Sequence, residues 1–229
     1  MMELSYRRHR FPPVVIQHAV WVYLRFTLSY RDVEDLLAER GLDISYETVR
    51  SWVLKFGPVI ARRLRRGRPR PSDRWHLDEM VVRIAGKRMY LWRAVDHEGE
   101  VLEAVVTARR DKAAALKLLK RIMKKYGAPR IIVTDRLRAY PAAMNEIGVA
   151  AKRHEVGGRL NNRAENSHQP FRRREWAMQR FRSLKTLQKF SSVYAQVQNH
   201  FNQERHLVTR QVYKQRRTAA LEEWRALAA

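Results

Sequence analysis

Three acidic residues, Asp78, Asp135 and Glu165, could together hold divalent cations. Asp78 shares one face of an expected strand with apolar residues at 80, 82 and 84, where a hydrophobic side chain would be ordinary. Asp135 directly follows the apolar run 131–134, and open α/β sheets place ligand groups at the carboxyl ends of buried strands. The alternatives are a surface Asp at a strand end for Asp78 and a helix cap for Asp135.

Glu165 lies among amide and imidazole side chains. On a helix, Asn161 and Asn162 lie one turn before it and His168 one turn after it, so all three share its face. Such residues support a ligand better than they solvate a helix. The chain has no cysteine, and three carboxylates are hard oxygen ligands that favour Mg²⁺ or Mn²⁺ over zinc. Two such ions can activate a water or a 3′-hydroxyl and stabilise the leaving oxygen in phosphodiester displacement.

The charge of the chain predicts a polyanionic partner. Its 229 residues include 47 Lys and Arg against 23 Asp and Glu, a net charge of +24. Residues 1–74, 75–150 and 151–229 carry +7, +6 and +11, so the positive charge is not confined to one tail. Nucleic acid is the favoured partner. An anionic membrane is the rival, but no single amphipathic segment concentrates the charge, and no apolar run suits a membrane span. A cytoplasmic location fits the absence of cysteine.

The elements before residue 65 predict a helix-turn-helix domain over 1–64. Pro12 and Pro13 open a first helix, Ser29 and Asp32 form a capping pair for a second, and Gly41 is placed to end it. In this motif the N-terminal residues of the next helix enter the major groove of DNA. The base-reading candidates are Tyr46, Glu47, Thr48, Arg50 and Ser51. The alternative is a small helical bundle with a solvated polar face.

A basic, proline-interrupted segment at 65–74 is typical of a linker, and the pattern beyond it changes to strands. Strands are expected at 75–84, 87–96, 101–108, 131–134 and 149–152, with helices at 112–126 and 139–147 and a long helical region after the Gly157-Gly158 loop. This order predicts an α/β domain over 75–190, a mixed sheet with flanking helices on both faces. The helical region 191–229 would pack on it or pair with a second subunit.

Basic residues follow Glu165 on the same helical region. Aromatic residues at 171, 176 and 181 are interleaved with them, a combination that suits contacts to the DNA backbone and bases. The basic residues are Arg172, Arg173, Arg174, Arg180, Arg182, Lys185 and Lys189. The alternative is a solvated helix face.

Four motifs make the chain resemble the DDE transposases of bacterial insertion sequences, most closely the compact family that transposes replicatively through cointegrates. They are WHLDE at 75–79, YLWRAVD at 90–96, TD at 134–135 and NNRAENSH at 161–168, preceded by LSYRDVE at 28–34 in the helix-turn-helix region. The resemblance implies an RNase H-like catalytic core, related to retroviral integrases, with Asp78, Asp135 and Glu165 as the metal-binding triad. It also implies binding of terminal inverted repeats, Mg²⁺-dependent strand cleavage and strand transfer.

One departure from the family and two rival carboxylates bear on this assignment. The 29 residues between Asp135 and Glu165 are fewer than is usual for the family, although a loop can shorten at small entropic cost. Glu79 is set aside because it points to the opposite strand face from Asp78, and Asp96 because it begins a turn. A DNA-binding repressor or relic that no longer catalyses, and a structure-selective nuclease, are the alternative functions. A homodimer or higher oligomer is expected, because transposition joins two ends, and so is a nucleoid-associated location in a bacterium.

Overall fold

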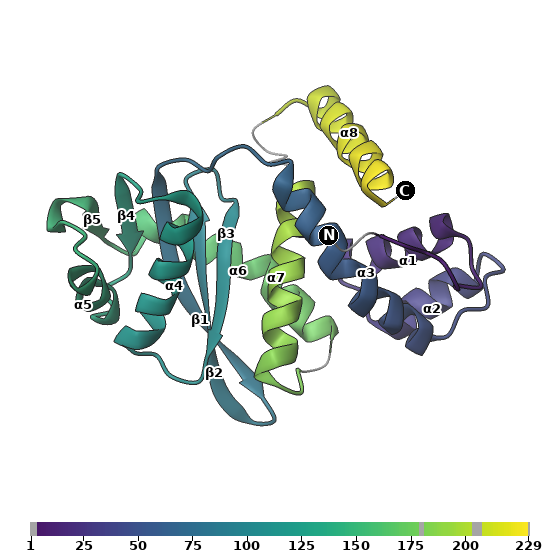
Figure 1. The fold of residues 1–229 in the computed structure, drawn as a ribbon, viewed down its shortest axis with the longest axis horizontal. Coiled ribbons are helices and arrows are strands. Elements are labelled where there is room, and N and C mark those ends of the chain that lie inside the picture. Colours follow the sequence, from purple (N-terminus) through teal and green to yellow (C-terminus); the bar gives the residue numbers. More distant parts are fainter. Residues whose placement is uncertain (1–3, 179–180, 203–207, 229) are drawn as a thin grey trace. The chain divides into compact units, whose positions relative to one another are not determined.

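The computed structural model describes residues 4–178, 181–202 and 208–228, drawn as a ribbon in Figure 1. The chain divides into two compact units. One comprises Met1–Arg68 and Gln196–Ala229, and the other comprises Pro69–Ala195. The C-terminal residues therefore belong to the same unit as the N-terminal ones. Within the described parts of the chain, no helix has the length and apolar character needed to cross a membrane.

The first unit is helical. Local signals build its first turns: the Ser29 Oγ accepts from the Asp32 N–H at 3.1 Å, and the Asp32 carboxylate accepts from the Ser29 N–H at 2.6 Å. Gly41 has a φ of 74°, which suits glycine after a helix end, and Ser45 caps the next helix. That helix continues to Arg66, two residues into the predicted linker. The described helices of this unit are α1 (Pro13–Arg25), α2 (Tyr30–Ala38), α3 (Tyr46–Arg66) and α8 (Arg210–Ala228). The helix α7 (Leu184–Phe201) belongs to this unit only from Gln196 onward.

The second unit contains a five-stranded mixed sheet in the order β3-β2-β1-β4-β5. The first three strands pair antiparallel, whereas β4 pairs parallel to β1 and β5 pairs parallel to β4. The strands are β1 (Arg74–Ile84), β2 (Lys87–Asp96), β3 (Val101–Thr107), β4 (Ile131–Thr134) and β5 (His154–Val156). This confirms the predicted α/β class and its mixed sheet.

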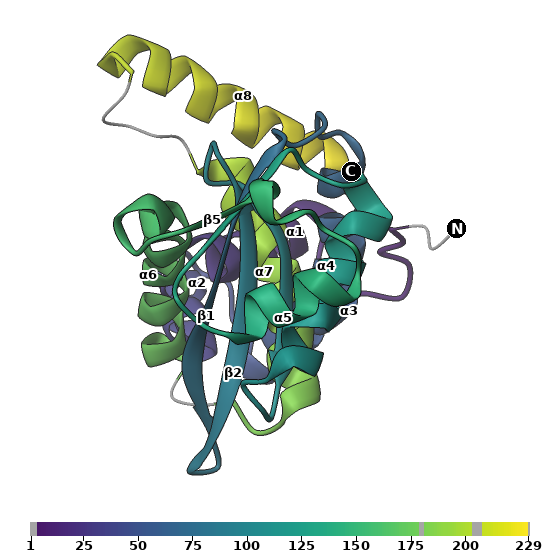
Figure 2. The same ribbon diagram turned by 90° about the vertical axis from the view of Figure 1, so that its left-hand side faces the viewer.

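Helices cover both faces of this sheet, as Figure 2 shows for α6 on one side and α4 and α5 on the other. Side chains alternate along β1, so Leu77 packs in the core beneath α4 (Lys112–Tyr126) and α5 (Ala139–Glu146). Met80 packs instead with Phe171 of α6 (Asn162–Ala177) and Leu187 of α7. Asp78 is in phase with Met80 and therefore belongs to the α6 face, as the sequence pattern predicted.

The last strand corrects the sequence prediction. A strand was expected at 149–152, but Val149 closes the end of α5, where its N–H donates to the Met144 carbonyl at 3.0 Å. Gly148 precedes it with a φ of 71°, so the segment forms a helix-ending turn. A 3₁₀ turn at Ala151–Arg153 follows, and the strand β5 comes only afterwards.

Candidate active site

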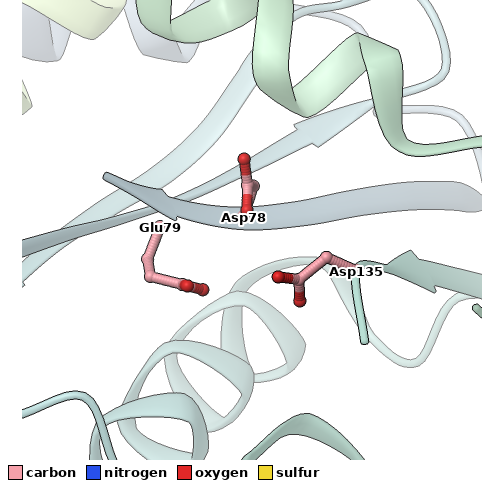
Figure 3. A group of neighbouring side chains, drawn as sticks. All are labelled: Asp78, Glu79 and Asp135. Carbon is pink, nitrogen blue, oxygen red and sulfur yellow. The ribbon is translucent and has the colours of Figure 1, made fainter. Parts of the chain in front are cut away.

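Two of the three predicted carboxylates meet because their strands are parallel neighbours. Leu77 of β1 pairs with Thr134 of β4, so Asp78 and Asp135 each stand one residue beyond the same register pair. One carboxylate oxygen from each of Asp78, Glu79 and Asp135 lies within 4.8 Å of the other two. Figure 3 shows Asp78 on one side of its strand, while Glu79 and Asp135 face each other on the opposite side. The end of β4 and the adjoining middle of β1 thus bring together a set of hard oxygen donors.

Asp135 also organises the chain that follows it. One carboxylate oxygen accepts from the Leu137 N–H at 3.0 Å, and the other lies 3.6 Å from the Arg110 guanidinium. Because α5 begins only at Ala139, Asp135 closes a turn and does not cap that helix. This turn fixes the carboxylate at the end of β4.

Glu79 belongs to the opposite sheet face and has partners there. Its carboxylate accepts the Tyr140 hydroxyl of α5 at 2.9 Å and the Arg110 Nε–H at 2.6 Å. Its side chain is only 2% exposed. The sequence placed Glu79 on that face but did not show that the carboxylate reaches the neighbourhood of Asp135. No local pattern indicated this position, because the residues that hold the carboxylate, Tyr140 and Arg110, lie far from Glu79 in the sequence.

Glu165 is exposed near the start of α6, and its carboxylate is not part of the 4.8 Å cluster among the described residues. The preceding Ala164 is fully buried and packs against Val95 of β2, so this turn of α6 is anchored on the sheet. The negative charge of Glu165 is close enough to raise the pKa of Asp78. The structure therefore brings Asp78 and Asp135 together and places Glu165 on the helix over the face from which Asp78 projects.

The site has unbalanced negative charge. Burial, helped by the charges of Glu79, Asp135 and Glu165, raises the pKa of Asp78 from 3.8 to about 7. A bound cation would reverse this effect, because it favours the ionised carboxylate. Carboxylate chemistry and charge therefore both suit a divalent cation.

The three support residues have different surroundings. Asn161 is fully buried, and its amide donates to the Leu77 carbonyl at 2.9 Å, which ties the start of α6 to β1 beside Asp78. The His168 Nδ1 lies 3.6 Å from the Asp78 carboxylate. Burial, with the charges of Arg93 and Arg172, lowers the pKa of His168 to about 3, so the ring is neutral at physiological pH. Asn162 is exposed at the first position of α6.

The base-reading candidates lie on the first turns of α3. Glu47, Arg50 and Ser51 are exposed there. Tyr46 is half-buried beneath the Arg31 guanidinium, whose Cζ lies 4.3 Å from the ring centroid. Thr48 is also half-buried, with its hydroxyl 3.1 Å from the Ser45 Oγ.

The structure corrects the expectation that Arg174 contacts DNA. Arg173 is exposed and Arg172 pairs with Glu175 at 3.0 Å, but Arg174 is fully buried with its Cζ 5.9 Å from the Phe190 ring centroid. The reason is the rotation of α6, which turns every third or fourth residue toward the sheet. The aromatic residues divide in the same way: Phe171 and Phe181 are buried, whereas Trp176 is 79% exposed.

Two other residues complete the description. Asp96 serves a turn, as predicted, by accepting the N–H groups of Glu98 at 3.1 Å and Glu100 at 2.9 Å. Arg93 was not singled out from the sequence, although it is fully buried on the α6 face directly opposite Asp78. The spacing in the sequence could have indicated this burial. Arg93 lies two residues from both Leu91 and Val95, so on a strand it shares their buried face.

Comparisons with known proteins identify the family of the chain. Residues 72–204 match a family model described as the DDE domain of IS240-type transposases. The chain is 33% identical to the transposase for insertion sequence-like element IS431mec of Staphylococcus aureus, over 83% of this chain and 87% of that protein. It is 32% identical to the S. aureus transposase for insertion sequence element IS257 in transposon Tn4003, with the same coverage.

Solved structures show a more distant similarity. The HTLV-2 integrase catalytic core domain in complex with magnesium is 14% identical, with a TM-score of 0.38, over 63% of this chain and 97% of that chain. The family match covers more than half of the sequence, and the S. aureus relatives are similar over most of their length. The chain therefore belongs to the DDE transposases of the IS240 type, a family of polynucleotidyl-transferase enzymes.

Proposed function

We propose that this transposase binds the terminal inverted repeats of its insertion sequence, cleaves a DNA strand at each end and joins the exposed 3′-hydroxyls to target DNA. The observation that carries the proposal is that Asp135, just beyond the end of β4, lies beside Asp78 in the middle of the parallel neighbour β1, in a chain of the DDE family. Glu165 on α6 is the third member of the proposed triad. Its helix turn is anchored on the sheet through Ala164.

We assign Asp78, Asp135 and Glu165 as ligands for Mg²⁺ or Mn²⁺, with two ions as the expected number. Such ions would supply activation of the attacking hydroxyl and stabilisation of the leaving oxygen. The raised pKa of Asp78 supports this assignment, because burial and, after it, the neighbouring carboxylates disfavour its ionised form, which a bound cation would favour. Glu79 is not assigned as a ligand, since Tyr140 and Arg110 already occupy its carboxylate.

The residues around the triad hold it in place. Asn161 fixes the backbone of β1 immediately before Asp78, and the Leu137 N–H fixes one oxygen of Asp135. The neutral His168 ring lies beside Asp78, with its Nδ1 3.6 Å from the carboxylate. These contacts preorganise two carboxylates before substrate arrives, which lowers the cost of reaching the reactive geometry.

We assign end recognition to residues 1–64, connected by the segment 65–74 to a catalytic core over 75–190. The exposed Glu47, Arg50 and Ser51 are the base-reading candidates, with Tyr46 and Thr48 half-buried beside them. The net charge of +24 supports a DNA partner whose phosphates are contacted in many places. The C-terminal region 191–229 and a second copy of the chain would complete the assembly, because two DNA ends must be joined. We expect it to act on the bacterial nucleoid.

Alanine variants of the triad test this function. In Asp78→Ala, Asp135→Ala and Glu165→Ala, strand transfer of a labelled precut end into a plasmid should disappear with Mg²⁺ or Mn²⁺ present. Binding of the same end, measured by an electrophoretic shift, should survive, because it depends on residues 1–64. The proposal is wrong if the triple variant still joins the precut end to the target.

A variant in α3 tests the recognition part separately. Arg50→Ala should lower the preference for the inverted repeat over unrelated DNA of the same length, since a base contact carries sequence information. Lys55→Ala, farther along α3, is the matched control. Equal preference for the repeat in Arg50→Ala and wild type would contradict the assignment of α3 as the reading helix.

A further inference from the structure

A buried arginine lies on the same sheet face as the proposed metal ligands. Arg93 on β2 pairs in register with Asp78 on β1, so the two side chains project from neighbouring positions of one face. Leu91 and Val95, two residues to either side, pack on that same face. Arg93 is 0% exposed. A permanently charged residue is therefore enclosed where the strand pattern calls for an apolar one.

The contacts of Arg93 connect it to the turn that carries Glu165. Its Nε–H donates to the Ser167 Oγ at 3.3 Å, and the Ser167 hydroxyl donates to the Ala164 carbonyl at 2.6 Å. Ala164 immediately precedes Glu165. One turn later, the Phe171 ring centroid lies 5.9 Å from the Arg93 Cζ. Arg93 thus contacts α6 at two successive turns.

Arg93 keeps its charge despite burial. Burial lowers its pKa from 12.5 to about 10, so it stays protonated at physiological pH. Its charge also contributes to keeping the neighbouring His168 neutral. Enclosing a cation in a protein core is costly, and an apolar residue of similar size is often as stable or more so. A role at the site explains why an arginine stands there.

We propose that Arg93 is a positioning residue of the DDE site, which holds the Ala164–Ser167 turn of α6 so that Glu165 is placed over Asp78 and Asp135. Arg93 acts on the site through its contacts with Ser167 and Phe171 of α6. This inference rests on the proposed function of the triad. It concerns the placement of the ligands and assigns Arg93 no contact with DNA or metal.

Arg174 provides a matched control. It is also a fully buried arginine in contact with an aromatic ring, since its Cζ lies 5.9 Å from the Phe190 centroid. It comes nine residues after Glu165, however, and faces the core of Phe190 and its neighbours. If the removal of any buried arginine lowers Mn²⁺ affinity and strand transfer, Arg93→Met and Arg174→Met should therefore lose both equally.

The experiment measures Mn²⁺ affinity of the full chain by calorimetry, with strand transfer of a precut end as a second readout. Arg93→Met should lose between about 10-fold and 100-fold in Mn²⁺ affinity and in strand transfer, as substitutions behind metal ligands do. Arg93→Lys should recover part of both the Mn²⁺ affinity and the strand transfer, because its ammonium can still donate to the Ser167 Oγ but cannot reproduce the fixed geometry of the guanidinium. Arg174→Met should keep the wild-type Mn²⁺ affinity.

Three results would overturn the inference while leaving the proposed function intact. They are wild-type Mn²⁺ affinity and strand transfer in Arg93→Met, equal losses in Arg93→Met and Arg174→Met, and no recovery in Arg93→Lys. If Arg93→Met does not fold, Ser167→Ala and Arg93→Lys decide: wild-type strand transfer in both would contradict the positioning role. Failure of the wild-type chain itself to bind Mn²⁺ or join strands would count against the proposed function.

Discussion

The carboxylates on the two sides of β1 have different partners. On the α5 side, Glu79 receives the Tyr140 hydroxyl and the Arg110 guanidinium, so the protein itself balances its charge. On the α6 side, Asp78 lies against the neutral ring of His168, and burial raises its pKa to about 7. Burial raises the pKa of both carboxyl groups. At Glu79 the Tyr140 hydroxyl and the Arg110 guanidinium oppose this rise, whereas at Asp78 the neighbouring carboxylates add to it.

This contrast decides which carboxylate completes the proposed triad. Glu79 is nearer to Asp78 and Asp135, yet it is buried and engaged. Glu165 is farther away, exposed, and on a helix turn anchored to the sheet. A metal ligand must be available as well as close. To bind a cation, Glu79 would have to give up hydrogen bonds from both Tyr140 and Arg110, whereas Arg110 lies 3.6 Å from the Asp135 carboxylate.

The largest effect expected from this contrast is at Asp135, which lies between the two sides. Asp135→Asn should reduce strand transfer to background, because the amide keeps the turn contact with the Leu137 N–H but removes a charged metal ligand. Asp73→Asn, at an exposed position before β1, is the control and should match wild type. Residual transfer in Asp135→Asn well above background would remove Asp135 from the ligand set.

The raised pKa of Asp78 predicts a pH signature. Between its ordinary value of 3.8 and about 7, the folded protein binds a proton at Asp78 that the unfolded chain does not. Without divalent ions, this contribution to stability is therefore fully present below pH of about 4 and is lost as the pH rises through about 7. The melting temperature should fall more over this range in wild type than in Asp78→Asn.

Adding Mn²⁺ should reverse the trend, because cation binding needs the ionised carboxylate and releases its proton. The same melting experiment at saturating Mn²⁺ should show wild-type stability rising with pH, while Asp78→Asn changes little. Parallel profiles for the two proteins, with and without Mn²⁺, would contradict the raised pKa of Asp78.

A smaller effect is expected on the balanced side. Tyr140→Phe removes the hydroxyl that Glu79 accepts, which should cost about 2 kcal/mol in the free energy of unfolding measured with urea. Strand transfer at a temperature where the protein stays folded should be nearly unchanged. Tyr90→Phe on β2 is the matched control. A loss of strand transfer in Tyr140→Phe would show that the Glu79 side takes part in the reaction.

The smallest effect is expected at the surface. Arg173→Ala, on the exposed side of α6, should reduce the slope of log DNA affinity against log salt by about 1, as loss of one phosphate contact does. Lys120→Ala, an exposed cation on α4 over the other sheet face, should leave the slope unchanged. Equal slopes for Arg173→Ala and wild type would remove Arg173 from the DNA surface.

Local signals explain what the sequence could predict. The Ser29 and Asp32 pair and the Gly41 turn both act within a few residues, and each lies where the pattern indicated. The alternation along β1 also placed Asp78 and Glu79 on opposite faces. Such features depend on neighbours in the chain, so a single sequence contains the information.

The features that sequence reasoning missed depend on distant contacts or on helix rotation. The partners of Glu79 come from α5 and from the segment before α4, and the burial of Arg174 depends on how α6 lies on the sheet. Val149 resembles a strand residue, but its N–H closes α5. Strand patterns place arginine on the exposed face, so the burial of Arg93 could be predicted only from its spacing of two residues from Leu91 and Val95.

The choice between the two glutamates is the central claim, and one pair of variants tests it most directly. Glu165→Gln and Glu79→Gln each remove one charge with little change in shape, and both are assayed for strand transfer of a precut end with Mg²⁺. Glu165→Gln should fall to background, whereas Glu79→Gln should lose no more than about tenfold. The opposite result, with Glu79→Gln inactive and Glu165→Gln active, would show that the compact cluster of Asp78, Glu79 and Asp135 is the metal site.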